Sequence, residues 1–133
     1  MNVLVADKDG AFLTHIVTLI RSWGYDADGA GTGLETLEKV KEQLFDLVLL
    51  DMTLPDMTAQ ELINRLKELR PDLGIVTMTG MNTDGLENQI RTLGIIYYML
   101  KPVREKVLKE IIDHIARRKE GKRGDPDSHA TVP

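Results

Sequence analysis

Acidic, hydroxyl and basic side chains follow short apolar runs at four places in this chain. Carboxylate oxygens are ligands that Mg²⁺ prefers, and a lysine or a hydroxyl stabilises the charge on a transferring phosphoryl oxygen. If these side chains meet in the folded protein, the chemistry they support is phosphoryl transfer assisted by a hard cation. The residues are, in chain order, Asp7, Lys8, Asp9, Asp51, Thr79 and Lys101.

Two kinds of apolar pattern alternate along the chain and place these residues. Continuous apolar runs, such as Val3–Ala6, are typical of strands that are buried on both faces. Between the runs, apolar residues recur at spacings of three and four, which predicts amphipathic helices. Two capping-box patterns, Thr32–Glu35 and Thr58–Glu61, mark helix starts. The expected strands span residues 3–6, 25–30, 46–51, 74–79 and 95–100.

Five strand-helix units in succession predict an α/β fold with a parallel sheet and helices on both faces. Right-handed crossovers leave few topologies, and the flavodoxin-like, doubly wound order 2-1-3-4-5 is the most economical. In such sheets the carboxyl ends of the strands form one edge, where ligands bind. The charged and hydroxyl residues named above are all expected at that edge.

The amino-acid composition of the chain excludes several kinds of site and classes of protein. The 133 residues contain no cysteine, which excludes disulfides, thiolate metal sites and a thiol nucleophile. The chain has no apolar run of the roughly 20 residues that a membrane span needs, and no secretory signal, so a cytoplasmic location is expected. A net charge of −4 argues against nucleic-acid binding. Residues 119–133 are polar and are predicted to form a flexible tail.

Four motifs together resemble the receiver domain of two-component response regulators, and the resemblance covers residues 1–118. It implies a phosphoprotein of signal transduction that promotes its own phosphorylation and has no enzymatic turnover beyond autodephosphorylation. Each motif is weak alone, but their order and their positions at the strand ends make the set specific. The motifs are the acidic-pair position after the first strand, LLDMTLPDM around Asp51, VTMTG ending at Gly80, and YYMLKP around Lys101.

The resemblance implies a role for each motif residue. Asp51 resembles the phosphoacceptor aspartate, and Asp7 resembles the first member of the acidic pair that holds Mg²⁺ together with Asp51. The backbone carbonyl of Thr53 matches a further metal ligand. Thr79 resembles the hydroxyl that binds a phosphoryl oxygen after transfer, and Lys101 resembles the lysine that pairs with the phosphorylated aspartate.

Two further residues match the family's switch, and the resemblance also implies partners. Gly80 leaves access to the acyl phosphate open. Tyr98 matches the aromatic residue whose side chain moves inward with the hydroxyl of Thr79, which implies a relay to a downstream protein through the fourth helix, fifth strand and fifth helix. The expected phosphodonor is a sensor histidine kinase or a phosphotransfer protein, and family members also form homodimers. No membrane or nucleic-acid partner is expected.

Lys8 departs from the family pattern, which has a second acid at this position. An ammonium group has only donors and cannot ligate Mg²⁺, so weaker Mg²⁺ binding and slower phosphorylation are expected. Asp9 is interpreted as the N-cap of the first helix in preference to a replacement ligand. A further hypothesis is an ion pair between Lys8 and Asp51 that mimics part of the metal's charge.

Two functions therefore stay open on sequence grounds. The first is a phosphoacceptor receiver. The second is a pseudo-receiver, in which Lys8 disables the Mg²⁺ site and the fold serves as a phosphorylation-independent protein-binding module. A third interpretation, an FMN-binding flavodoxin-like enzyme, is discounted because no phosphate-binding loop follows the first strand.

Overall fold

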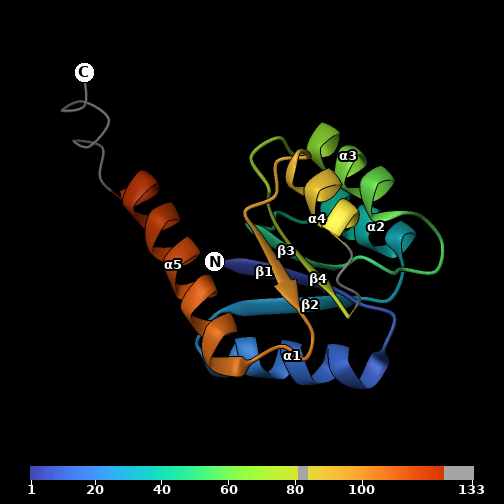
Figure 1. The fold of residues 1–133 in the computed structure, drawn as a ribbon. Coiled ribbons are helices and arrows are strands. Elements are labelled where there is room, and N and C mark those ends of the chain that lie inside the picture. Colours follow the sequence, from blue (N-terminus) through green and yellow to red (C-terminus); the bar gives the residue numbers. More distant parts are fainter. Residues whose placement is uncertain (81–83, 125–133) are drawn as a thin grey trace. The chain divides into compact units, whose positions relative to one another are not determined.

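Strands and helices alternate through the whole described part of the chain (Figure 1). The computed structural model describes residues 1–80 and 84–124. The strands are β1 (Asn2–Ala6), β2 (Asp26–Ala30), β3 (Leu47–Asp51), β4 (Gly74–Thr79) and β5 (Tyr97–Leu100). The helices are α1 (Gly10–Ser22), α2 (Gly33–Glu42), α3 (Ala59–Leu69), α4 (Asp84–Arg91) and α5 (Glu105–Gly124). The predicted strands are confirmed, with ends displaced by at most two residues.

The sheet is parallel and has the predicted order β2-β1-β3-β4-β5. β3 and β4 are buried along their whole length, as expected for strands covered on both faces. The register aligns the carboxyl ends of neighbouring strands: Ala6 lies opposite Leu50, and Thr79 lies opposite Leu100. The residues that follow these positions are therefore presented at one edge of the sheet.

Four of the helices belong with the sheet to one compact unit, Met1–Pro102. Figure 1 shows α1 on one face of the sheet and α2, α3 and α4 on the other. The main core cluster joins sheet residues such as Leu50 and Ile75 to Leu37 of α2, Leu62 of α3 and Ile90 of α4. This arrangement confirms the doubly wound architecture.

Local side-chain contacts explain where three helices begin. Thr32 Oγ1 accepts the N–H of Glu35 at 3.0 Å, and Thr58 Oγ1 accepts the N–H of Glu61 at 3.1 Å. Both predicted caps are thus present, and each satisfies a donor that a helix start leaves unpaired. Asp9 caps α1 in the same way. Helix α3 stops at Leu69, before Pro71.

The second unit begins at Val103 and contains α5. This helix continues to Gly124, so residues 119–124, which the sequence assigns to a flexible tail, are helical. The run Arg117–Lys119 is made of good helix formers, and there is no proline between Pro102 and Pro126. The rest of the predicted tail, residues 125–133, lies outside the described residues. Within 1–80 and 84–124, no helix has the length and apolar character needed to cross a membrane.

Candidate functional site

Two buried carboxylates lie at the carboxyl edge of the sheet. Asp7 follows β1 and its residue is 1% exposed, while Asp51 ends β3 and is 2% exposed. β1 and β3 are paired neighbours, which brings the two carboxylates into one site. Burial of two like charges is unfavourable without a compensating cation. The two buried carboxylates therefore require a positive charge close to them.

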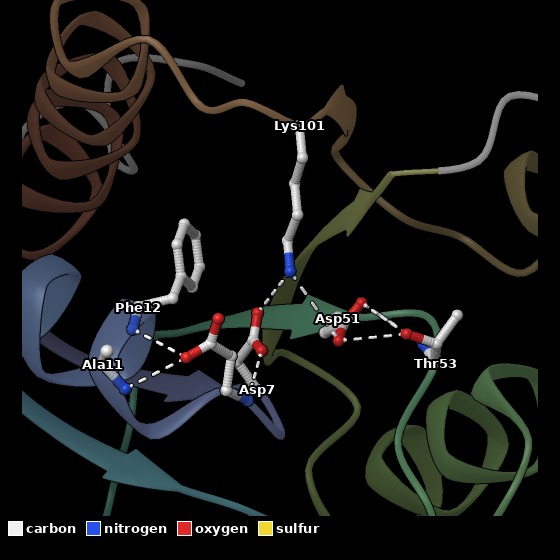
Figure 2. Close-up of polar contacts among 7 residues, drawn as sticks. Asp7, Ala11, Phe12, Asp51, Thr53 and Lys101 are labelled. Atoms are coloured by element: carbon white, nitrogen blue, oxygen red, sulfur yellow. Dashed lines mark hydrogen bonds and ion pairs between the residues drawn. The ribbon is translucent and has the colours of Figure 1, made fainter.

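Lys101 supplies that charge from the loop after β5. Its Nζ atom lies 2.6 Å from Asp7 Oδ2 and 3.8 Å from Asp51 Oδ2 (Figure 2). The backbone N–H of Lys101 donates to the carbonyl of Thr79 at 2.8 Å, which ties the start of the loop to β4. The Lys101–Pro102 peptide bond is cis. The ammonium group thus bridges the two carboxylates, and its shorter contact is with Asp7.

Thr53 orients the Asp51 carboxylate. Its backbone N–H donates to Asp51 Oδ1 at 3.3 Å, and its hydroxyl lies 3.2 Å from both carboxylate oxygens (Figure 2). These contacts hold the carboxylate at the edge of the sheet with neutral donors, so they leave its charge in place. The metal-ligand role of the Thr53 carbonyl stays a prediction.

Asp9 has the capping role that the sequence favours. Its Oδ1 atom accepts the N–H groups of Ala11 at 3.1 Å and Phe12 at 3.2 Å at the start of α1. Its own backbone N–H donates to Asp7 Oδ1 at 2.9 Å. The Asp9 side chain therefore anchors the helix, while its backbone orients Asp7.

Lys8 is exposed and forms no hydrogen bond or ion pair with any residue that the structure describes. The hypothesis of a Lys8–Asp51 ion pair is therefore wrong for this structure, since Lys101 pairs with Asp51 instead. Lys8 lies in a bend beyond the end of β1, where its side chain is exposed, whereas Asp7 directly after the strand is buried. Among the described residues, no group of three or more His, Asp or Glu side chains is placed to hold a metal.

The structure also places the predicted switch residues. Thr79 is fully buried at the end of β4, and Tyr98 is 8% exposed and belongs to the main core cluster. Gly80 follows Thr79 and is exposed. Thr79 and Lys101 are joined through their backbones, as described above. The roles of Thr79, Tyr98 and Gly80 in a phosphorylation switch remain predictions.

Phe12 is a site residue that the sequence analysis missed. Its ring centroid lies 4.5 Å from Lys101 Nζ, within the range of a cation–π contact. In the sequence, Phe12 is only one member of the apolar stripe of α1, so nothing in the pattern distinguishes it from a core residue.

The residues present fit a weak Mg²⁺ site. Mg²⁺ commonly takes one or two protein carboxylates and completes its coordination with water and phosphate oxygens, and Asp7 and Asp51 meet that minimum. Both oxygens of Asp7 already accept hydrogen bonds, one from Asp9 N–H and one from Lys101 Nζ. A divalent cation at this site must therefore compete with Lys101 for Asp7.

Asp56 is a second residue that the sequence analysis missed, in the loop between β3 and α3. Its Oδ1 accepts the N–H of Gly33 at 2.7 Å and its Oδ2 accepts the N–H of Leu34 at 2.9 Å. These two hydrogen bonds to the start of α2 lower the pKa of Asp56 below its usual value of 3.8. The loop that follows Asp51 is thereby attached to a neighbouring helix.

The depressed pKa of Asp56 predicts a stability change in acid. A group whose pKa is lower in the folded state stabilises the fold above its unfolded pKa, and this stability is lost as the pH falls through the folded value. We expect Asp56→Asn to be less stable than the natural protein near neutral pH, with the difference shrinking below about pH 4. Urea unfolding midpoints across this range measure the difference. Asp72→Asn, at an exposed carboxylate, is the control, and an equal pH dependence in both variants would contradict the expectation.

The fold and the site together define a class of protein. A flavodoxin-like parallel sheet carries two buried carboxylates and a lysine at the carboxyl ends of β1, β3 and β5. The family model of the response regulator receiver domain matches residues 3–113. The chain belongs to this family, whose members are signalling modules of two-component systems and not turnover enzymes.

Similar proteins agree with this assignment. The transcriptional regulatory protein ZraR of Klebsiella oxytoca is 33% identical over 103 residues, which cover 77% of this chain and 23% of that protein. The two-component response regulator ORR22 of Oryza sativa subsp. indica is 33% identical over 125 residues, covering 92% of this chain and 18% of the relative. The chain thus spans about a quarter or less of the length of these relatives.

Solved structures show the same fold. A CheY-like receiver domain protein from Methanospirillum hungatei JF-1 has a TM-score of 0.82 and 28% identity, and the match covers 90% of this chain and 97% of that one. A two-component response regulator from Clostridium difficile has a TM-score of 0.85 at 24% identity, covering 90% of this chain and 98% of the other.

Proposed function

We propose that this chain is a phosphoacceptor receiver in which Asp51 accepts a phosphoryl group from a phosphohistidine of a sensor kinase or phosphotransfer protein. A carboxylate oxygen of Asp51 forms a bond to phosphorus, and the bond from phosphorus to the histidine nitrogen breaks. The leaving nitrogen keeps the electron pair, and the product is an acyl phosphate. The observation that supports this proposal is the convergence of Asp51, Asp7 and Lys101 at one edge of the sheet.

The chain's own residues lower the charge barrier to this step. An anionic donor approaches two buried carboxylates, and the Lys101 ammonium offsets the repulsion. The hydroxyl and N–H of Thr53 hold the Asp51 carboxylate in one orientation. Mg²⁺, when bound by Asp7, Asp51 and the Thr53 carbonyl, supplies further positive charge to the phosphoryl oxygens.

Signal output follows from the charge added at Asp51. Thr79 and Lys101 bind the new phosphoryl oxygens, and Tyr98 repacks with Thr79. This changes the surface contributed by α4 and β5, and a downstream protein reads the change. We expect this phosphorylation and its output to occur in the cytoplasm.

A pseudo-receiver is the second candidate, and one observation favours it. Lys8 stands where the family has a metal-binding acid, while Lys101 already bridges Asp7 and Asp51. A site whose negative charge is partly offset by its own lysine can hold one conformation without a metal or a phosphoryl group. The protein would then bind its partner independently of phosphorylation.

Phosphorylation by a small acyl phosphate separates the two functions. We expect acetyl phosphate and Mg²⁺ to add one phosphoryl group to the natural protein, detected by intact mass, and Asp51→Asn to abolish the addition. Asp9→Asn is the matched control, since asparagine also caps a helix and Asp9 is not a ligand in this proposal. Loss of the mass gain in Asp9→Asn would assign Asp9 to the metal site. No mass gain in the natural protein, but a gain in Lys8→Asp, would favour the pseudo-receiver.

A further inference from the structure

The ring of Phe12 is held beside the Lys101 ammonium by the start of α1. The backbone N–H of Phe12 donates to Asp9 Oδ1 at 3.2 Å, and the side chain is half-buried. This cap fixes the first turn of the helix, so the ring is presented from a rigid element. Asp9 thus links Phe12 to Asp7, because its side chain accepts the backbone N–H of Phe12 and its own backbone N–H donates to Asp7.

Three groups contact one ammonium at unequal distances. Lys101 Nζ lies 2.6 Å from Asp7 Oδ2, 3.8 Å from Asp51 Oδ2 and 4.5 Å from the ring centroid of Phe12. Figure 2 shows the ring and Asp7 on one side of the ammonium and Asp51 on the other. The negative face of an aromatic ring attracts a cation, and the attraction grows when the cation is partly removed from water. The Lys101 side chain is 24% exposed, so water screens this contact only in part.

We propose that Phe12 is a positioning residue that holds Lys101 on Asp7 and so sets the affinity of the site for a divalent cation. The inference rests on the proposed function, because it takes Asp7 and Asp51 as the cation-binding carboxylates. The ring stabilises the Lys101 ammonium, which competes with the metal for Asp7. It takes no part in the hydrogen bonds that the two Asp7 oxygens accept. Weakening the ring contact therefore frees Asp7 without altering the ligand set.

The first experiment compares Mg²⁺ binding by calorimetry in three proteins. Phe12→Leu removes the ring and keeps an apolar side chain of similar reach. We expect this variant to bind Mg²⁺ about two- to fivefold more tightly than the natural protein, because that factor corresponds to the free energy of a partly exposed cation–π contact. Phe12→Tyr retains an aromatic face and should bind Mg²⁺ as the natural protein does. Equal affinity in the natural protein and Phe12→Leu overturns the inference.

A second comparison excludes a general loosening of α1. In the Lys101→Gln background there is no ammonium to position, so Phe12→Leu should leave the Mg²⁺ affinity unchanged. A gain that persists in this background overturns the inference, since it would not act through Lys101. Melting curves by circular dichroism confirm that each variant is folded before it is titrated.

A third measurement tests the contact between Phe12 and Lys101 without any phosphorylation of Asp51. NMR of the Lys101 side chain reports the ring directly, because the ring current of Phe12 shifts the resonances of the neighbouring methylene and ammonium protons. That shift should vanish in Phe12→Leu and persist in Phe12→Tyr. Absence of Mg²⁺ binding in every variant overturns the inference, whereas failure of the proposed function appears as absence of a mass gain on Asp51.

Discussion

Lys8→Asp is expected to bind Mg²⁺ about ten- to a hundredfold more tightly than the natural protein, because the change replaces a positive charge beside the site with a negative one. Aspartate also offers an oxygen donor where the ammonium offers none. Lys8 is exposed and forms no hydrogen bond or ion pair with another described residue, so its replacement breaks none of these interactions. Calorimetric titration with Mg²⁺ at fixed ionic strength measures the change.

A neutral substitution separates the two contributions of the aspartate. Lys8→Gln removes the positive charge without supplying a carboxylate, and we expect an affinity between those of the natural protein and Lys8→Asp. Faster phosphorylation of Asp51 by acetyl phosphate should accompany the tighter binding in Lys8→Asp. An unchanged Mg²⁺ affinity in both variants would show that Lys8 does not limit the site.

Loss of the Lys101 charge is expected to have the largest effect on stability. In the absence of divalent cations, Lys101→Gln should lower the free energy of unfolding by about 3 kcal/mol, because it leaves two buried carboxylates without their counter-ion. Urea unfolding in the presence of a chelator measures this loss. Addition of Mg²⁺ should restore part of the stability, since the metal replaces the missing positive charge.

Two matched variants test the cause of this loss. Lys109→Gln breaks an ion pair of similar length, 2.7 Å to Asp113, but that pair is between neighbouring turns of α5 and the lysine is 49% exposed. We expect that variant to lose at most about 0.5 kcal/mol. Asp7→Asn combined with Lys101→Gln should recover much of the stability, because it removes one of the uncompensated charges. Equal losses in Lys101→Gln and Lys109→Gln would contradict the explanation.

Much of the fold follows from local patterns in the sequence. The apolar runs and the helical spacings predict the order of strands and helices along the chain. The handedness rule leaves few sheet topologies, and the most economical of them is the order that is observed. The helix starts at Thr32 and Thr58 could be predicted because a cap depends on residues only three positions away. The end of α5 could not be placed as well, because charged residues such as Arg117 and Arg118 suit both a helix and a polar tail.

Some features of the candidate site also follow from the sequence alone. The sequence by itself determined which residue types stand at the carboxyl ends of the strands, because strand periodicity and chain order place Asp7, Asp51 and Lys101 there. It also determined that Lys8 cannot serve as a metal ligand, since this follows from the chemistry of the ammonium group.

Only the tertiary structure decided which cation the carboxylates face. Lys101 reaches Asp7 across a separation of 94 residues, and its Nζ atom also lies 3.8 Å from Asp51 Oδ2 and 4.5 Å from the ring centroid of Phe12. Lys8 is adjacent to Asp7 in sequence but faces solvent. Side-chain direction and long-range packing set these contacts, and neither can be read from a local pattern.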